Sequence, residues 1–347
     1  MRTYRFPVRS LAVALLLPLA GCGVRFVVDI VPVETGLSET VVLEERVPGR
    51  DPFDPAGPDK VALVEVGGVL RGVAQPGPLN PFGGSTRPVA GFVEALDRAK
   101  RDAKVKAVLV RIDSPGGSVN ASQVMYEELR RFREETGKPV VVHTGEFTAS
   151  GGYYLACAAD EIVTSPSTIT GSIGVIYQTF NASAGLARIG VAADAITSGP
   201  NKALASPFEP QEAEHREILQ TLVDEFYAQF TEVVRSERPD IPAEAWDEVT
   251  DGRVVSGVRA VELGLADSTG DIHDAFERCR ALAGIRGARL VQYHPAMSRV
   301  ATVYGTAPTT PAEAAGDRPT IDLEITAPGA SAPSGRFLYL WDPAAWR

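Results

Sequence analysis

From residue 61 onward, short apolar segments alternate with segments of helical spacing, and this alternation allows few folds. The apolar segments predict buried strands at residues 61–66, 105–112 and 139–143. The segments with apolar side chains every three or four positions predict helices at residues 89–103, 118–135 and 151–159. Strands that alternate with helices indicate a parallel sheet joined by helical crossovers. We therefore expect an α/β fold.

The segments on either side of this region have a different pattern. Residues 22–60 contain short apolar runs broken by Pro and Gly, which predicts a tether with short strands or a hairpin. Residues 307–334 are rich in Pro, Ala and Gly and predict an irregular segment, whereas the apolar residues 337–341 predict a docked strand. Residues 212–235 predict a long amphipathic helix, with apolar positions at Ile218, Leu219, Leu222, Val223, Phe226, Phe230 and Val233.

Length and composition are those of a folded protein with one large domain or two ordinary ones. The chain has 347 residues, of which 44% are hydrophobic, and its three cysteines are too few for a disulfide scaffold. We expect a main domain over residues 61–285 and a partly irregular C-terminal extension over residues 286–347. Acidic residues exceed basic ones by 44 to 34, which gives a formal charge of -10. No nucleic-acid partner is expected, because phosphate binding needs a basic surface.

The first 21 residues have the pattern of a secretory signal. Three arginines precede an apolar run over residues 11–19, which is too short to span a membrane. Small residues then lead to Cys22, and residues 19–22 resemble the bacterial lipobox, in which the cysteine is lipidated. The alternative is an ordinary secretory signal followed by a chance cysteine. We expect residues 1–21 to be a lipoprotein signal and Cys22 to anchor the protein to a membrane of the cell envelope, outside the cytoplasm; the choice between inner and outer membrane stays open.

Two further cysteines, Cys157 and Cys279, lie in segments with helical spacing. A disulfide between them is an alternative in an oxidising compartment. We expect them instead to be buried separately as small apolar side chains.

Two glycine-rich turns follow consecutive predicted strands, at residues 113–118 and 149–154. In a parallel sheet both turns would lie side by side at the edge formed by the carboxyl ends of the strands. Ser150 in the second turn has a hydroxyl, and the paired glycines of the first turn leave backbone N–H groups free to bind an anion. The pattern fits a nucleophile beside an oxyanion hole. A simple helix N-cap is the alternative role for Ser150.

A nucleophilic serine needs a base, and the chain offers four histidines and one suggestive lysine. His143 lies in a predicted strand, His215 and His273 in predicted helices, and His294 before a proline, so none has a recognisable Ser-His-Asp context. An Ala-Leu-Ala run follows Lys202, which is a poor setting for a solvated lysine. We favour Lys202 over the histidines, although an ordinary loop lysine is the simpler alternative on these residues alone.

Four stretches, at residues 113–118, 149–154, 169–175 and 198–202, resemble the signal peptide peptidase A family of membrane-associated Ser-Lys proteases. That family belongs to the Clp protease and crotonase superfamily. Supporting matches lie at residues 206–208, 251–254 and 260–267. The order and spacing agree over roughly two thirds of the chain, which is more specific than any single motif.

The resemblance implies a fold and a set of site residues. It implies a Clp protease/crotonase-like parallel sheet, with Ser150 as nucleophile and Lys202 as general base. The N–H groups of Gly151 and Gly116 would form the oxyanion hole, with Gly117 as the less favoured alternative to Gly116. Hydrophobic peptides such as signal-peptide remnants would be the substrates, without a metal or organic cofactor.

The family also implies a homo-oligomer, because its nucleophile and base come from different units of a ring-like assembly. A single-unit chain such as this one would have to associate with copies of itself to be active. The apolar faces of the helix at residues 212–235 and of residues 337–341 are candidates for subunit contacts. A closed ring of identical interfaces is the expected form.

A lysine base works only in its neutral form. A lysine in water has a pKa near 10.4, so only about one in 10³ is neutral at pH 7. Burial among apolar atoms favours the neutral form. We therefore expect Lys202 to lie in an apolar environment.

Thr148 departs from the family pattern, since it stands where the family usually has a small apolar residue, and would narrow the site.

Two other interpretations stay open. A catalytically silent scaffold lipoprotein would not need both Ser150 and Lys202. An acyl-CoA enzyme of the crotonase type would not need an export signal.

Overall fold

The computed structural model describes residues 37–44, 58–72, 88–295 and 337–340. The predicted signal (residues 1–21) and the lipidation site Cys22 lie outside these residues. Within them, no helix is both long and apolar enough to cross a membrane.

The chain forms an α/β fold around a mostly parallel sheet, as the alternating pattern predicts. The central strands pair in the order β1-β11-β2-β3-β5-β6-β10, with β7 beside β5 and β9 beside β7. Only the pairs β1–β11 and β7–β9 in this sheet are antiparallel. The strands are β1 (Leu37–Glu44), β2 (Asp59–Gly67), β3 (Val105–Ser114), β5 (Val140–Ala149), β6 (Glu161–Thr164), β7 (Ile169–Gly171), β9 (Val254–Ser256), β10 (Ser268–Thr269) and β11 (Ala288–Pro295).

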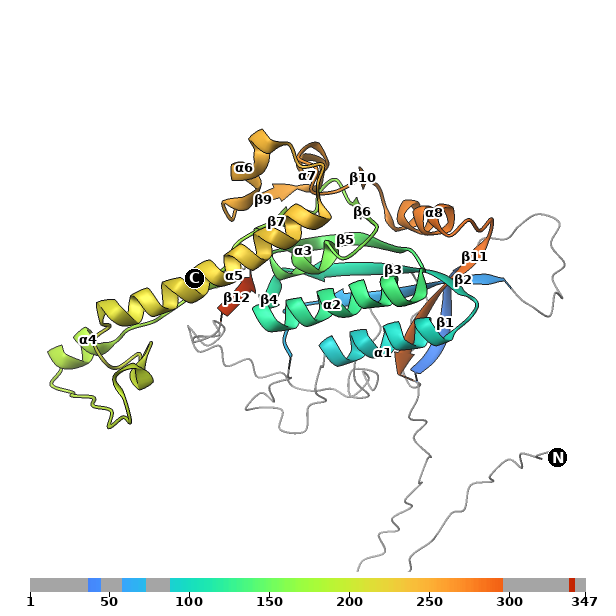
Figure 1. Ribbon diagram of the computed structural model, residues 1–347. Coiled ribbons are helices and arrows are strands. Elements are labelled where there is room, and N and C mark those ends of the chain that lie inside the picture. The colour runs from blue at the N-terminus through green and yellow to red at the C-terminus, as the bar shows by residue number, and fades with distance from the viewer. Residues whose placement is uncertain (1–36, 45–57, 73–87, 296–336, 341–347) are drawn as a thin grey trace, which may run out of the picture.

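Helices cover both faces of the sheet, and Figure 1 shows α1 and α2 on one face and α8 on the other. Alternate side chains of β2 enter separate cores: Ala62 and Val64 pack with the first layer, and Val61 and Leu63 with α8. The helices are α1 (Pro88–Arg101), α2 (Val119–Thr136), α3 (Gly151–Ala156), α4 (Ser183–Arg188), α5 (Ala213–Glu237), α6 (Trp246–Thr250), α7 (Gly257–Glu262) and α8 (Ile272–Leu282), with short 3-10 turns η1 (Pro200–Ala203) and η2 (Ala243–Ala245). The strands and helices predicted from residue 61 onward are therefore present.

The sheet extends beyond the region predicted to contain it. Part of the predicted tether is the edge strand β1, which pairs with β11 across most of the chain length. β11 itself lies in the segment predicted as a C-terminal extension and pairs with β2. The apolar run at Val41–Leu43 signalled a strand, but its partner is too distant in sequence for a local pattern to reveal.

A second, three-stranded sheet has the order β4-β12-β8. Its strands are β4 (Gly116–Ser118), β12 (Phe337–Leu340) and β8 (Ile176–Tyr177). The docked strand predicted at residues 337–341 is thus confirmed as β12, and it docks beside the first glycine-rich turn.

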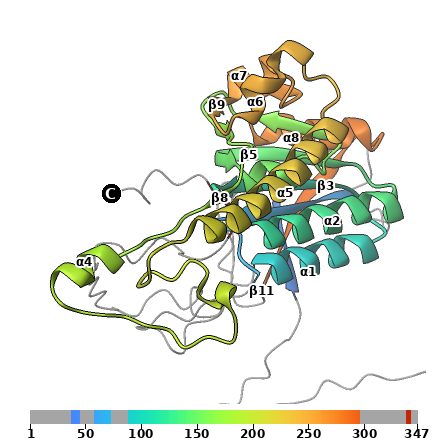
Figure 2. The ribbon, with the colours of Figure 1, turned by 60° about the vertical axis from the view of Figure 1, so that its left-hand side comes forward.

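Residues 178–212, here called the arm, project from the body of the molecule. In Figures 1 and 2 the arm reaches away from the sheet and carries α4 at its far end. None of its residues, all described by the structure, is buried. Phe180 and Ile189 expose 71% and 73% of their surface. The arm therefore has no hydrophobic core of its own in the single chain.

The two internal cysteines behave as predicted. Cys157 ends α3 and Cys279 lies in α8, and both are free and buried. Burial raises the pKa of each thiol, Cys157 to about 12, so both remain neutral and unreactive.

Candidate active site

Ser150 lies at the abrupt junction between β5 and α3, at the carboxyl end of a central strand. Its backbone is in a sparsely populated region, with φ 52° and ψ −117°. The backbone is held there from both sides: Ser150 N–H donates to the Gly171 carbonyl at 2.8 Å, and the Ser150 carbonyl accepts from Tyr154 N–H at 2.9 Å. Strain of this kind persists only where surrounding contacts enforce it, and it is concentrated at functional sites.

The side chain of Ser150 does not cap α3. Only 1% of the residue's surface is exposed in the single chain. The simple N-cap role is therefore not observed. Ser150 is instead a buried residue at the amino end of α3, next to the N–H groups that the first turn of a helix leaves without an intrahelical acceptor.

Gly151 and Gly152 bring α3 close to β3. Gly151 begins α3, so its N–H is among those that a helix leaves without an intrahelical acceptor. A Cβ atom on Gly152 would lie 2.9 Å from the Ser114 carbonyl oxygen, which is closer than real Cβ contacts. Gly152 is therefore required for packing, whereas Gly151 presents an available donor.

The first glycine-rich turn lies next to Ser150, as the sheet-edge argument predicts. Ser114, at the end of β3, is paired with Thr148, two residues before the nucleophile candidate. Gly116 has a φ of 103° that favours glycine, and its N–H donates to the Ser114 Oγ atom at 3.1 Å. The Ser114 hydroxyl in turn donates to the Gly68 carbonyl at 2.6 Å. The acceptor of the Gly116 N–H is thus the neutral hydroxyl of Ser114, within the same turn.

Gly117 has a packing role. A Cβ atom there would lie 2.0 Å from the Leu70 carbonyl oxygen, because Leu70 pairs with this residue as a short parallel bridge. The requirement for glycine at this position therefore follows from the close approach of two backbones.

Two supporting side chains in this region were not singled out as such from sequence. The Asp113 carboxylate accepts from Phe147 N–H at 3.0 Å, and a Cβ on Gly145 would collide with the Asp113 side chain. Thr148 is fully buried, and its hydroxyl donates to the Ile112 carbonyl at 2.8 Å. These bonds hold residues 144–149 in β5, so the strand continues beyond its predicted end at residue 143. Ser150 therefore lies at the sheet edge.

The motif at residues 169–175 supports the turn at Ser150 through its backbone. β7 pairs with the end of β5, and Gly171, at φ 83°, supplies the carbonyl that receives Ser150 N–H. The Thr170 hydroxyl donates to the Thr148 carbonyl at 2.6 Å. The motif therefore explains why the chain can turn so sharply at Ser150.

Lys202 is not buried in the single chain, which corrects the expectation drawn from its apolar neighbours. It lies in η1 on the arm, and its side chain is exposed. In both views of the molecule, the arm extends away from β5 and α3 (Figures 1 and 2). The Ala-Leu-Ala run that follows Lys202 is only half-buried, because the arm has no core of its own.

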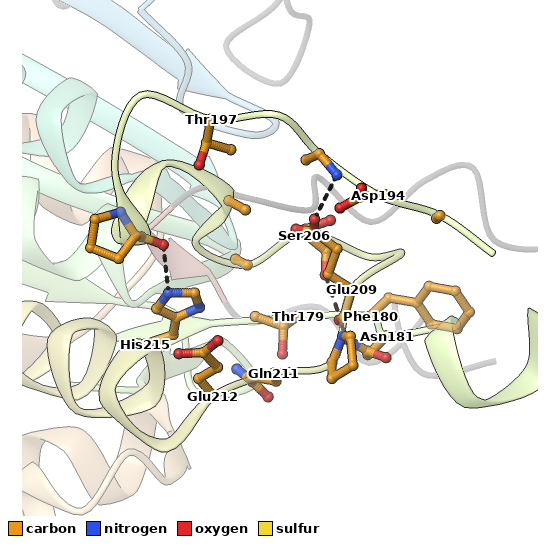
Figure 3. Close-up of a pocket in the computed structure, with 16 residues that line it drawn as sticks. Thr179, Phe180, Asn181, Asp194, Thr197, Ser206, Glu209, Gln211, Glu212 and His215 are labelled. Carbon is orange, nitrogen blue, oxygen red and sulfur yellow. Dashed lines mark hydrogen bonds between the residues drawn. The ribbon is translucent and has the colours of Figure 1, made fainter. Parts of the chain in front are cut away.

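A cavity of about 320 Å³ lies at the base of the arm and is shown in Figure 3. His215 of α5 enters it and is buried, and its Nε2 atom lies 3.2 Å from the Pro200 carbonyl, two residues before Lys202. Glu209 on the opposite side accepts from Ala195 N–H at 3.0 Å. The contact of His215 with Pro200 holds the Lys202 segment against α5, and the bond of Glu209 with Ala195 joins two parts of the arm. No pattern in the sequence signals this role of His215.

His143 occupies a different environment and does not approach Ser150. It is buried in β5, and its Nε2 atom lies 3.5 Å from Ser165 Oγ. Burial, together with the nearby charge of Arg111, lowers the pKa of His143 to about 4. A histidine that stays neutral in the sheet interior fits a structural role.

Comparison with known proteins identifies the family. The profile of Peptidase family S49 matches residues 132–286. A Synechocystis protein named as a protease is 36% identical over 234 residues, which are 67% of this chain and 78% of the relative. Protease 4 of Salmonella typhi is also 36% identical, over 70% of this chain but only 38% of its own length. The Arabidopsis thaliana chloroplastic serine protease SPPA is 33% identical over 66% of this chain and 33% of its own.

Among solved structures, the 1510-N membrane-bound stomatin-specific protease matches 64% of this chain and 85% of its own, at 15% identity and a TM-score of 0.40. Among the described residues, no group of three His, Cys, Asp or Glu side chains is arranged to hold a metal ion. On the sequence matches, the chain is a peptidase and belongs to peptidase family S49.

Proposed function

We propose that this peptidase is a membrane-anchored serine endopeptidase in which Ser150 is the nucleophile and Lys202 of a second copy is the general base. The observation that carries the proposal is the backbone of Ser150, which is strained, buried and held at the sheet edge between two glycine-rich turns. The Ser150 side chain does not cap α3, so a capping role does not account for the strained backbone.

In the proposed reaction, the Ser150 oxygen attacks the carbonyl carbon of the scissile peptide bond while the Ser150 proton moves to a neutral Lys202 amine. The protonated lysine then returns the proton to the leaving amine. An acyl-enzyme remains, and water hydrolyses it by the same proton route. No group outside the protein and the water is required.

The developing oxyanion would be bound by the N–H groups of Gly151 and Gly116. Gly151 has a free helical N–H, and Gly116 N–H at present donates to Ser114 Oγ. A bond to a charged oxygen is roughly twice as strong as one to a neutral hydroxyl. The Gly116 N–H would therefore turn from Ser114 to the oxyanion as charge develops.

A second copy is needed because the base is exposed on the arm while the nucleophile is buried in the body. A lysine base has to act in its neutral form, which burial among apolar atoms favours. The exposed apolar side chains of the arm, among them Phe180, Ile189 and Phe208, provide the surface that such an association would bury. Docking the arm on a neighbouring body would both desolvate Lys202 and complete the site.

The proposed substrates are hydrophobic peptides, such as remnants of signal peptides, at a membrane surface outside the cytoplasm. The support is the lipobox-like segment that ends at Cys22 and the resemblance of the four motifs. A lipid-anchored enzyme would meet apolar peptides as they leave the bilayer.

Labelling with a fluorophosphonate probe tests the proposal, since such probes react with activated serines. The wild-type chain should be labelled, while Ser150→Ala and Lys202→Ala should not. Ser165→Ala is a matched control, because Ser165 lies near His143 and away from the proposed site. Absence of labelling in the wild type at any pH would contradict an activated serine, and labelling of Ser150→Ala would place the nucleophile elsewhere.

A further inference from the structure

Lys202, the proposed base, lies in a segment that has little support of its own. η1 is a short 3-10 turn, and no residue in it is buried. Lys202 N–H donates to the Gly199 carbonyl at 3.2 Å, and Leu204 N–H donates to the Asn201 carbonyl at 3.4 Å. Both bonds are longer than the usual N–H···O distance of about 2.9 Å. The position of Lys202 therefore depends on what holds η1.

His215 of α5 holds η1 at its first residue. Only 6% of the surface of His215 is exposed, and its Nε2 atom lies 3.2 Å from the carbonyl oxygen of Pro200 (Figure 3). A carbonyl can only accept a hydrogen bond, so Nε2 has the proton and donates. A proline has no N–H, which leaves this carbonyl as the one backbone group of Pro200 that can form a hydrogen bond. The contact therefore anchors η1 two positions before Lys202.

α5 is in turn fixed to the body of the molecule by its second half. Phe230 is fully buried, and its ring centroid lies 5.1 Å from that of Tyr154 in α3, in an edge-on arrangement. At the end of the helix, the Arg238 guanidinium donates two hydrogen bonds to the Asp267 carboxylate, at 2.9 and 3.0 Å. Because α3 begins directly after Ser150, α5 links η1 to the helix that follows the proposed nucleophile.

The length of α5 sets how far apart these two attachments lie. Fifteen positions separate His215 from Phe230. At a rise of about 1.5 Å per residue, they are about 22 Å apart along the helix axis. Figures 1 and 2 show this part of α5 extending from α3 toward the arm. A lysine side chain, with its four-carbon stem, is much shorter than this distance. The geometry therefore favours a base that serves another copy, with α5 as the element that fixes where the base is presented.

We propose that His215 is a positioning residue for the base: it holds η1 against α5 and so fixes the direction in which Lys202 is presented to the neighbouring copy. The inference rests on the proposed function, in which Lys202 takes the Ser150 proton. His215 acts through the Pro200 carbonyl and moves no proton itself. Without this bond, η1 would keep only its own long turn bonds, and the amine would adopt several orientations. A misplacement of about 1 Å at a reacting group can reduce a rate by roughly 10².

Substitutions that differ in one donor test the role of the bond. His215→Phe keeps a ring, and His215→Leu keeps a smaller apolar side chain, but neither can donate to the Pro200 carbonyl. Both should slow fluorophosphonate labelling of Ser150 about tenfold with unchanged circular dichroism. His215→Gln retains an N–H donor and should restore most of the rate. His273→Leu, on α8 and exposed, is the matched control and should label as the wild type. Wild-type labelling of both His215→Phe and His215→Leu would overturn the proposal.

Mixed assemblies distinguish positioning of the base from general support of the fold. A Ser150→Ala chain supplies only the base and a Lys202→Ala chain only the nucleophile, so each labelled site contains one of each. His215→Phe added to the Ser150→Ala chain should slow labelling about tenfold. The same substitution in the Lys202→Ala chain should leave the rate as in the parent pair, because that chain has no base to position. A loss of stability or of association would instead slow labelling equally in both placements.

The outcomes separate this inference from the proposed function. A parent pair that associates but shows no labelling would refute a site built from two copies, and the positioning role with it. A parent pair that labels at a rate independent of which chain has His215→Phe would refute the positioning role alone. A rate that falls only when His215→Phe lies on the Ser150→Ala chain would uphold it.

Discussion

Gly152→Ala offers a quantitative test of how the nucleophile turn is built. The added Cβ atom would lie 2.9 Å from the Ser114 carbonyl oxygen, and also within 3.6 Å of the Ile112 side chain. Ordinary contact begins near 3.4 Å, so α3 and β3 must separate by about 0.5 Å. The Ser114 carbonyl is a backbone group of the packed sheet edge and cannot rotate away, whereas the Ile112 contact is of ordinary length.

The expected loss of stability follows from two opposing terms. Overpacking costs about 1–3 kcal/mol. The better helix propensity of alanine offsets up to about 1 kcal/mol of it. With the middle of each range, about 2 less about 0.5 kcal/mol, the net loss is about 1.5 kcal/mol, which corresponds to a Tm lower by roughly 3–6 °C for a domain of this size.

The expected loss of activity is larger than the loss of stability suggests. A misplacement of about 1 Å can reduce a rate by roughly 10², so a shift of about half that should slow serine labelling about tenfold. Gly91→Ala in α1 is the control: nothing lies within 4 Å of its added Cβ, and it should gain up to about 1 kcal/mol with unchanged labelling. Thermal unfolding and the rate of fluorophosphonate labelling measure the two effects. Wild-type values for Gly152→Ala in both assays would refute the packing argument.

Three further predictions concern the base, the buried histidine and the anchor. Lys202→Arg should label as poorly as Lys202→Ala with unchanged circular dichroism, because a guanidinium cannot take the Ser150 proton; retained labelling would exclude Lys202 as the base. For His143, whose pKa is about 4 in the fold and about 6.5 when unfolded, only the unfolded chain binds the proton between these values. Stability should therefore fall by about 2 kcal/mol from pH 7.5 to pH 5. In urea unfolding, His143→Ala should lose this dependence while Ser150 labelling persists, and an unchanged pH dependence would contradict the assignment. Cys22→Ser should release the protein from membranes, and mass spectrometry should find acyl chains on Cys22 of the wild type; an unmodified start at another residue would contradict the lipid anchor.

The central strands were predictable because burial on both faces leaves an unbroken apolar signal. β2 and the first part of β5 have such runs. The second half of β5 was missed, because Thr144 and Thr148 interrupt the run. Their hydroxyls form buried hydrogen bonds, Thr148 to the Ile112 carbonyl and Thr144 to Thr164, so polar side chains fit inside the sheet.

The adjacency of the two glycine-rich turns was predictable from topology, since consecutive parallel strands place their carboxyl ends together. The environment of Lys202 was not. Its apolar neighbours predicted burial, but they lie on an arm without a core, and only contact with another surface could bury them. A sequence pattern records that side chains are apolar and does not record which molecule covers them.

The strand at residues 337–340 illustrates the same limit. Its apolar composition predicted a docked strand, and β12 is one. Its position between β4 and β8 depends on pairing with residues more than 150 positions away, for which the pattern has no signal. The role of His215 beside Pro200 is equally invisible, because one buried histidine on a helix resembles any other.

Complementation between two inactive chains tests the central claim most directly. Ser150→Ala and Lys202→Ala chains, each inactive alone, are reassembled in equal amounts. If nucleophile and base come from different copies, a complete site forms where a Lys202→Ala chain, which keeps Ser150, meets a Ser150→Ala chain, which keeps Lys202. Random pairing then predicts about a quarter of the wild-type labelling. Mixed assemblies that contain both chains and show no labelling would contradict a Ser150–Lys202 site built between copies.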